Sequence, residues 1–217
     1  DTACVITPVH VGRLVCGYYV LNTNDLPDSV DKIKRVARAV NIALSSAVSR
    51  FRQFNMNLRL RRAAITDPLT GLPNLKGAVQ WFESFAANDA NHYKTLSVTV
   101  YGLPKYAYIL ENHGMDAVEE TLRITAEALK LANPSHCFIA HVAQDTFAVI
   151  NYYVDGNDVG PTIDQAGAVF FSQIEGYNSR SGLEYYVEVN CGCAVVSGGW
   201  DGSLEGYLRE ANEKLFQ

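Results

Sequence analysis

The segment from residue 28 to residue 65 constrains the fold of this chain most, because it contains neither glycine nor proline. Asp28 and Ser29 follow Pro27 and predict the N-terminal cap of a helix that meets no stop signal before Pro68. At about 1.5 Å per residue, roughly 36 helical residues extend about 54 Å, which is too long for a compact domain. This helix therefore needs a partner along its length.

Apolar residues recur along the helix at alternating spacings of three and four, until Arg61 interrupts the pattern. They are Ile33, Ala37, Val40, Leu44, Ala47, Phe51, Phe54, Leu58 and Ile65. Such a stripe is typical of a two-stranded parallel coiled coil, so we expect residues 27–66 to form a dimerising signalling helix. A single long helix packed on its own hairpin is the alternative.

Two short strands precede this helix. Residues 2–22 have a strand-like pattern with a turn at Gly12, and two strands alone cannot bury an apolar face. We therefore expect residues 1–26 to be the last hairpin of a sensor domain whose first part precedes this chain.

The sequence Asp67-Pro68-Leu69-Thr70-Gly71-Leu72-Pro73-Asn74 breaks the long helix sharply. Asp-Pro, Thr-Gly and Pro-Asn are turn-forming pairs, and proline cannot continue a helix cleanly. Asn74 is placed to cap a second helix over residues 75–87.

Strand and helix patterns alternate after this second helix. Strands are predicted at residues 96–101, 136–142, 146–151 and 184–196, and helices at 115–132, 161–177 and 203–216. This order predicts an α+β domain over residues 67–217, with an antiparallel sheet and its helices mostly on one face.

Composition and charge exclude several classes of protein. Apolar residues make up 48% and charged residues 19%, which excludes disorder and collagen. The longest uncharged stretch has 14 residues, too few for a membrane-spanning helix, which needs about 20. Lys and Arg outnumber Asp and Glu by ten to four through residue 66, and are outnumbered eight to nineteen after it. We interpret the basic half as a solvated helix face rather than a nucleic-acid surface.

The five cysteines lack metal-binding spacing and are expected to be small, buried thiols in a reducing cytoplasm. Cys191 and Cys193 lie in a predicted strand, with their sulfurs expected on opposite faces.

The octet at residues 67–74 reproduces the D-x-L-T-G-L-x-N signature of GGDEF domains, the diguanylate cyclases, and the chain resembles that family over residues 62–217. Residues 2–60 likewise resemble the end of a GAF-type sensor followed by a signalling helix. The resemblance implies a cyclase/polymerase-palm-like α+β fold. It also implies a dimer that joins two GTP molecules into cyclic di-GMP with the help of Mg²⁺.

The positions that correspond to the family's catalytic residues are altered. The two acidic residues at the end of the first strand of the domain align with Gly102 and Pro104, neither of which offers a carboxylate. The hairpin that carries Gly-Gly-Asp/Glu-Glu-Phe in the family aligns with Ala143, Gln144, Asp145, Thr146 and Phe147. Only the third and fifth positions keep their residue type, and we expect Phe147 to be a core residue.

The guanine-reading positions align with Leu110 and Glu119, and the product-inhibition motif aligns with Pro134 and Cys137. The family's phosphate-contacting lysine falls just past Gln217. Glu119 and Asp145 are thus the remaining residues that can contact a nucleotide. No residue is assigned a catalytic or metal-binding role, and no cofactor is expected, with Mg²⁺ needed only for residual activity.

These observations predict a catalytically inactive GGDEF domain that acts as a relay or dimerisation module in cyclic-di-GMP signalling. It would form a homodimer through residues 27–66, bind GTP weakly at most, bind no nucleic acid, and lie in the cytoplasm between a sensor and an output domain. Two alternatives remain. One is a diguanylate cyclase with residual activity, and the other is a GTP sensor that controls an attached phosphodiesterase domain.

Overall fold

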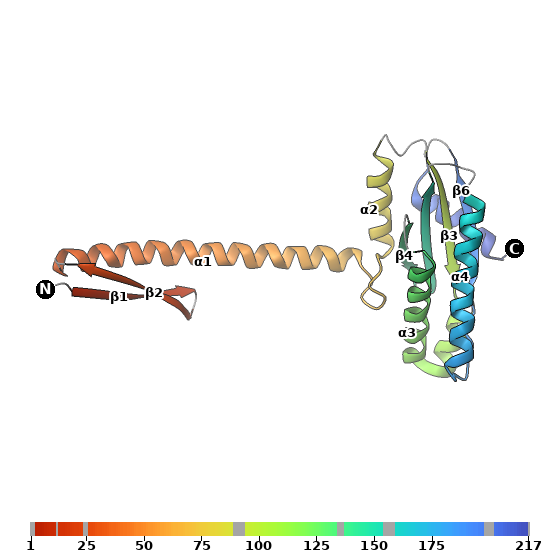
Figure 1. Cartoon of the computed structure of the whole chain (residues 1–217), viewed down its shortest axis with the longest axis horizontal. Coiled ribbons are helices and arrows are strands. Elements are labelled where there is room, and N and C mark those ends of the chain that lie inside the picture. The colour runs from red at the N-terminus through yellow and green to blue at the C-terminus, as the bar shows by residue number, and fades with distance from the viewer. Residues whose placement is uncertain are drawn as a thin grey trace. The chain divides into compact units, whose positions relative to one another are not determined.

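The computed structural model describes residues 3–11, 13–23, 26–88, 94–133, 137–153, 159–197 and 202–216. The chain divides into two compact units, Asp1–Arg61 and Arg62–Gln217 (Figure 1). Among the described residues, none of the helices combines the length and the apolar character needed to cross a bilayer.

The first unit contains a hairpin and most of a long helix. Strands β1 (Ala3–Val11) and β2 (Leu14–Thr23) pair antiparallel, and Gly12 of the predicted turn lies outside the described residues. Helix α1 (Leu26–Ile65) begins two residues before the predicted cap, because Pro27 is tolerated in the first turn, where its missing N–H costs nothing.

The hairpin covers the first half of the apolar stripe on α1. Ala37 is buried, Ile33 and Leu44 are half-buried, and the backbone N–H of His10 donates to Asn41 Oδ1 at 3.2 Å. Figure 1 shows the hairpin alongside this half of the helix. Packing on its own hairpin therefore holds for part of the first half of α1, where Val40 stays exposed, and the most exposed large residues of the predicted stripe, Phe51 and Phe54, lie in the second half.

The second unit is an α+β domain built on a four-stranded sheet, as the sequence predicts. Strands β3 (Thr95–Gly102), β4 (Cys137–Ala143), β5 (Thr146–Tyr153) and β6 (Asn190–Val196) lie in the order β4-β5-β3-β6. Every neighbouring pair is antiparallel. The helices are α2 (Leu75–Ala86), α3 (Tyr106–Ala132), α4 (Val159–Arg180) and α5 (Leu204–Glu213), followed by the short 3-10 helix η3 (Lys214–Phe216).

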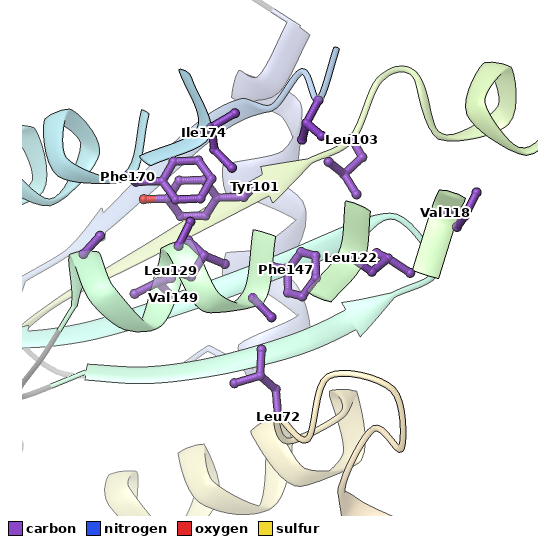
Figure 2. Close-up of a cluster of buried hydrophobic side chains, with 14 of the residues drawn as sticks. Leu72, Tyr101, Leu103, Val118, Leu122, Leu129, Phe147, Val149, Phe170 and Ile174 are labelled. Carbon is purple, nitrogen blue, oxygen red and sulfur yellow. The ribbon is translucent and has the colours of Figure 1, made fainter. Parts of the chain in front are cut away.

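The helices cover both faces of the sheet, so the prediction that most lie on one face is wrong. Leu96 and Val98 of β3 pack with α2 and α5, whereas Tyr101 packs with α3 and α4. Figure 2 shows the hydrophobic cluster that contains Tyr101, with Phe147 and Leu129 drawn beneath Tyr101 and Phe170. Because successive strand residues point to opposite faces, a strand that is buried at nearly every position, as β3 is, has cover on both sides.

Two predicted boundaries are wrong. Helix α3 begins at Tyr106 rather than Met115, with a break at Gly114, whose φ of 82° favours glycine. Strand β6 begins at Asn190 rather than residue 184, because its partner β3 ends at Gly102, opposite Asn190. Ahead of that point the Asn178 side chain exchanges hydrogen bonds with the backbone N–H and C=O of Val187, at 2.9 and 3.0 Å.

The cysteine predictions are also corrected. All five thiols are free, but Cys4, Cys16 and Cys191 are exposed rather than buried. Cys193 and Cys191 pair with Thr99 and Tyr101 of β3, two residues apart on each strand. Residues two apart on a strand share a face, so the two sulfurs lie on the same side of the sheet.

Candidate functional site

A pocket of about 210 Å³ lies where β3 ends beside the β4–β5 turn. The pairing of Gly102 with both Thr146 and Asn190 brings these strand ends together. The pocket is lined by Gly102, Leu103, Pro104, Asp145, Thr146, Asn190, Asn212 and Leu215. Four of these residues, Gly102, Pro104, Asp145 and Thr146, are among the positions singled out from the sequence.

The other polar residues of the pocket were missed by sequence reasoning. Asn190 begins β6, and Asn212 lies near the end of α5, so both reach the pocket only through tertiary packing. The close approach of α5 to β6 depends on Gly192, where an added Cβ would lie 2.2 Å from the carbonyl oxygen of Ala211. A glycine opposite a terminal amphipathic helix was the only sequence signal available.

Asp145 is the one acidic residue among those that line the pocket. Its Oδ1 accepts a hydrogen bond from Thr146 Oγ1 at 2.8 Å, and its backbone oxygen accepts from the N–H of Leu103 at 3.0 Å. The carboxylate is therefore partly engaged by its own turn. Such local bonding is typical of a turn aspartate.

The residues of this pocket do not fit a magnesium-triphosphate site. Mg²⁺ prefers octahedral oxygen ligation with carboxylates, and the pocket offers a single carboxylate beside two amide side chains. At Gly102 an added Cβ would lie 3.4 Å from Leu215 Cδ1, in van der Waals contact with η3. Within the described ranges, no three His, Cys, Asp or Glu side chains gather closely enough to hold a metal ion.

The remaining hairpin residues have structural contacts. Ala143 and Gln144 are exposed, and Gln144 Nε2 donates to the Tyr106 hydroxyl at 2.9 Å. Phe147 is fully buried and stacks on His141, with ring centroids 4.5 Å apart. The hairpin thus holds one core residue and two surface residues on either side of the pocket residues Asp145 and Thr146.

The positions aligned with guanine reading do not line this pocket. Leu110 is exposed on α3, and Glu119 Oε2 pairs with Arg123 Nη2 at 2.9 Å on the same helix. At the inhibition motif, the Cys137 thiol donates to the backbone oxygen of Asn133 at 3.1 Å, whereas Pro134 lies outside the described residues. The structure therefore brings Asp145, but not Glu119, into the pocket.

Asp67 organises the turn between α1 and α2. Its Oδ1 accepts hydrogen bonds from the Thr70 backbone N–H and hydroxyl, at 2.8 and 2.7 Å, and lies 3.3 Å from His141 Nδ1. Burial alone would raise the pKa of Asp67, but the bonds from Thr70 and the neighbouring His141 outweigh burial and lower that pKa below its ordinary value.

The lowered pKa predicts a defined pH dependence of stability. Because the folded-state pKa lies below the unfolded one, the carboxylate stabilises the fold above the ordinary value of 3.8, and this contribution disappears as the pH falls through the folded-state value. Asp67→Asn should therefore be less stable than the parent at pH values above 3.8, with the difference closing as the pH falls through the lowered folded-state pKa of Asp67. Urea unfolding at a series of pH values measures this difference.

Asp116→Asn, on the exposed surface of α3, is the matched control and should show no such closing gap. A gap between parent and Asp67→Asn that stays constant at every pH would contradict the assignment of the Asp67 contacts.

The fold and pocket define a class of α+β protein with a central antiparallel sheet, covered by helices on both faces and hollowed at a strand end. Solved structures share this fold. At 19% identity the chain is similar to the coiled coil and GGDEF domain of DgcB from Caulobacter crescentus in complex with c-di-GMP, with a TM-score of 0.65, covering 82% of this chain and 93% of that one.

Two structures from Pseudomonas aeruginosa have the same fold. Diguanylate cyclase SiaD in complex with its activator SiaC has a TM-score of 0.60 at 19% identity, covering 88% of this chain and 72% of that one. The FimX GGDEF domain has a TM-score of 0.56 at 15% identity, covering 70% and 91%. No curated protein matches the sequence.

The family match is direct. Residues 64–217 match the family described as "Diguanylate cyclase, GGDEF domain". The chain belongs to this GGDEF family, which is related to diguanylate cyclases in c-di-GMP signalling.

Proposed function

We propose that this chain is a GGDEF domain that no longer joins GTP molecules and instead serves as a relay and dimerisation module in cyclic-di-GMP signalling. The observation that carries the proposal is the pocket at Gly102. It is lined by one carboxylate, Asp145, and two amides, Asn190 and Asn212, and Gly102 itself offers no side-chain oxygen. Phosphoryl transfer depends on metal charge and positioning, which this lining does not supply.

The dimer would form through the second half of α1, where Phe51, Phe54 and Leu58 are exposed. The N-terminal hairpin supports a GAF-like sensor end over residues 1–26, followed by the signalling helix at 27–66 and the GGDEF domain at 67–217. The five free thiols fit a reducing cytoplasm.

Residual cyclase activity is the second candidate, because Asp145 lines the pocket and keeps one oxygen for a cation or a phosphate-bound ion. A GTP sensor that controls an attached phosphodiesterase domain has less support, since Glu119 is paired with Arg123 on the surface of α3. GTP binding without turnover would be its signature.

Purified protein incubated with GTP and Mg²⁺ or Mn²⁺ is expected to form no cyclic di-GMP, because the metal ligands are too few. Chromatographic detection of the product and calorimetry with GTP are the two measurements. The control is Asp145→Ala, which should behave like the parent. Turnover that is lost in Asp145→Ala would establish the residual cyclase instead, and micromolar GTP binding without product would establish the sensor.

A further inference from the structure

The last turn of α1 is bonded to the turn at residues 67–74. Asn74 donates its backbone N–H to the Ile65 carbonyl oxygen at 2.9 Å and its side-chain Nδ2 to the Ala64 carbonyl oxygen at 3.2 Å. These are orphan carbonyls at a helix end, which need partners. The same Asn74 accepts from the N–H of Gly77 and so caps α2. One side chain therefore joins the end of α1 to the start of α2.

The turn at residues 67–74 is also bonded to β4, at His141. The His141 backbone N–H donates to the Pro73 carbonyl oxygen at 2.8 Å, and Asn74 forms an isolated parallel bridge with His141. Asp67 Oδ1 lies 3.3 Å from His141 Nδ1. A backbone contact and a side-chain contact thus meet at one residue of the strand.

His141 also contacts the strand that leaves the hairpin. Its ring stacks on Phe147, with centroids 4.5 Å apart and an angle of 17° between the planes. His141 pairs with Phe147 across the ladder, and a register shift follows between His141 and Ala143, immediately before the Gln144–Asp145 turn. An interaction that restrains the His141 ring therefore also restrains the start of the turn that carries the pocket residues Asp145 and Thr146.

The His141 contact is made at a cost. The side chain is only 9% exposed, and its Nε2 is buried without a hydrogen-bond partner. An unpaired buried polar atom destabilises the folded state, so burial of the His141 Nε2 offsets part of the stabilisation that the contact with Asp67 contributes. Charged groups near this turn include Arg62 in the last turn of α1, Lys130, whose Nζ donates to the Thr70 carbonyl oxygen at 3.4 Å, and Glu127, the partner of Lys130 on α3. Lys76 and Glu83 are the charged residues of α2, which packs against β4.

We propose that the Asp67–His141 contact is a latch that couples the turn at residues 67–74 to the order of the hairpin at residues 143–146. When the latch is closed, the end of α1, the turn, β4 and Phe147 form one bonded path. When it opens, the hairpin loses the side-chain part of its connection to the turn, while the backbone contacts of His141 with Pro73 and Asn74 and the helical core remain. This inference deepens the proposed relay function. It rests on that function only for the direction of the signal, because the coupling is argued from the contacts of Asp67 and His141 alone.

Amide hydrogen exchange in the full 217-residue chain tests the latch. The reporter is the N–H of Leu103, which donates to the Asp145 carbonyl oxygen. The reference amides are those of Phe170 and Ile174, buried in α4. His141→Phe keeps a ring against Phe147, loses the bond to Asp67 and removes the unpaired nitrogen. It should raise exchange at Leu103 about tenfold, while exchange at Phe170 and Ile174 changes little.

Two further variants keep the test specific. Asp67→Asn, which removes the negative charge from this contact, should raise exchange at Leu103 in the same direction, and combining it with His141→Phe should add little, because both variants act on the Asp67–His141 contact. His113→Phe is the matched control. His113 Nε2 is also buried without a hydrogen-bond partner among the described residues, but its ring contacts Tyr108 and Tyr185, with centroids 6.0 and 4.8 Å away, rather than Asp67.

The latch is overturned if His141→Phe leaves Leu103 exchange unchanged, if it speeds the reference amides equally, or if His113→Phe has the same effect. Additive effects of Asp67→Asn and His141→Phe would also overturn it. Detection of cyclic di-GMP in the turnover assay would refute the proposed function. It would not affect the latch, which the exchange measurements test independently.

Discussion

Replacing Phe147 with alanine is expected to lower the free energy of unfolding by about 3–5 kcal/mol, although the residue belongs to the hairpin that defines the family. Phe147 is 0% exposed and lies in the cluster with Tyr101, Leu122 and Leu129 (Figure 2). Truncation would leave a cavity that the rigid sheet cannot fill. Because small domains are stable by only about 5–15 kcal/mol, this single change removes a large fraction of stability.

Urea denaturation followed by circular dichroism measures the loss. Gln144→Ala, three residues earlier in the same hairpin, is the control. Its side chain is exposed and makes one hydrogen bond to Tyr106, so the expected change is within about 0.5 kcal/mol. Similar small effects from both variants would show that Phe147 does not anchor the core.

Local sequence signals predicted the elements that depend on local chemistry. Asn74 caps α2 as expected, because an amide oxygen before an apolar periodic run is sufficient to start a helix. The octet at residues 67–74 predicted the turn and the family for the same reason. Where the physical cause lies within a few residues, the sequence was enough.

Features set by distant partners could not be predicted in this way. The end of β3 decides where β6 begins, and the close packing of α5 brings Asn212 and Leu215 to the pocket. The contact of Asp67 with His141 joins residues from separate parts of the chain, and the sequence pattern of neither part predicts it. Alignment brought Gly102 and Asp145 to attention, but which neighbours surround them depends on the fold.

The same limit applies to the long helix. Its apolar stripe was uniform in sequence, yet the hairpin covers Ile33, Ala37 and Leu44 and leaves the second half exposed. Periodicity shows which face of a helix must be buried, but it does not show which segment or partner buries that face. The dimer is therefore argued for the exposed half alone.

Phe54→Glu is expected to weaken homodimerisation at least about a hundredfold, because each protomer would lose a buried aromatic side chain worth about 2 kcal/mol. Phe51 and Phe54 are 67% and 60% exposed in the single chain, on the stripe that continues to Leu58. Sedimentation equilibrium across a range of protein concentrations gives the dissociation constants. Met56→Glu is the matched control: Met56 is 58% exposed on the same helix but lies off the stripe.

Salt dependence separates the apolar contribution from the electrostatic one. No acidic residue occurs between Asp31 and Asp67, so two parallel copies of the second half of α1 bring basic residues together without opposite charges to pair with them. Screening this repulsion should tighten the dimer as ionic strength rises. Because Phe54→Glu and Met56→Glu add the same charge, a loss confined to Phe54→Glu must come from the buried ring. Equal losses, or a parent that stays monomeric at every concentration, would contradict dimerisation through this half of the helix.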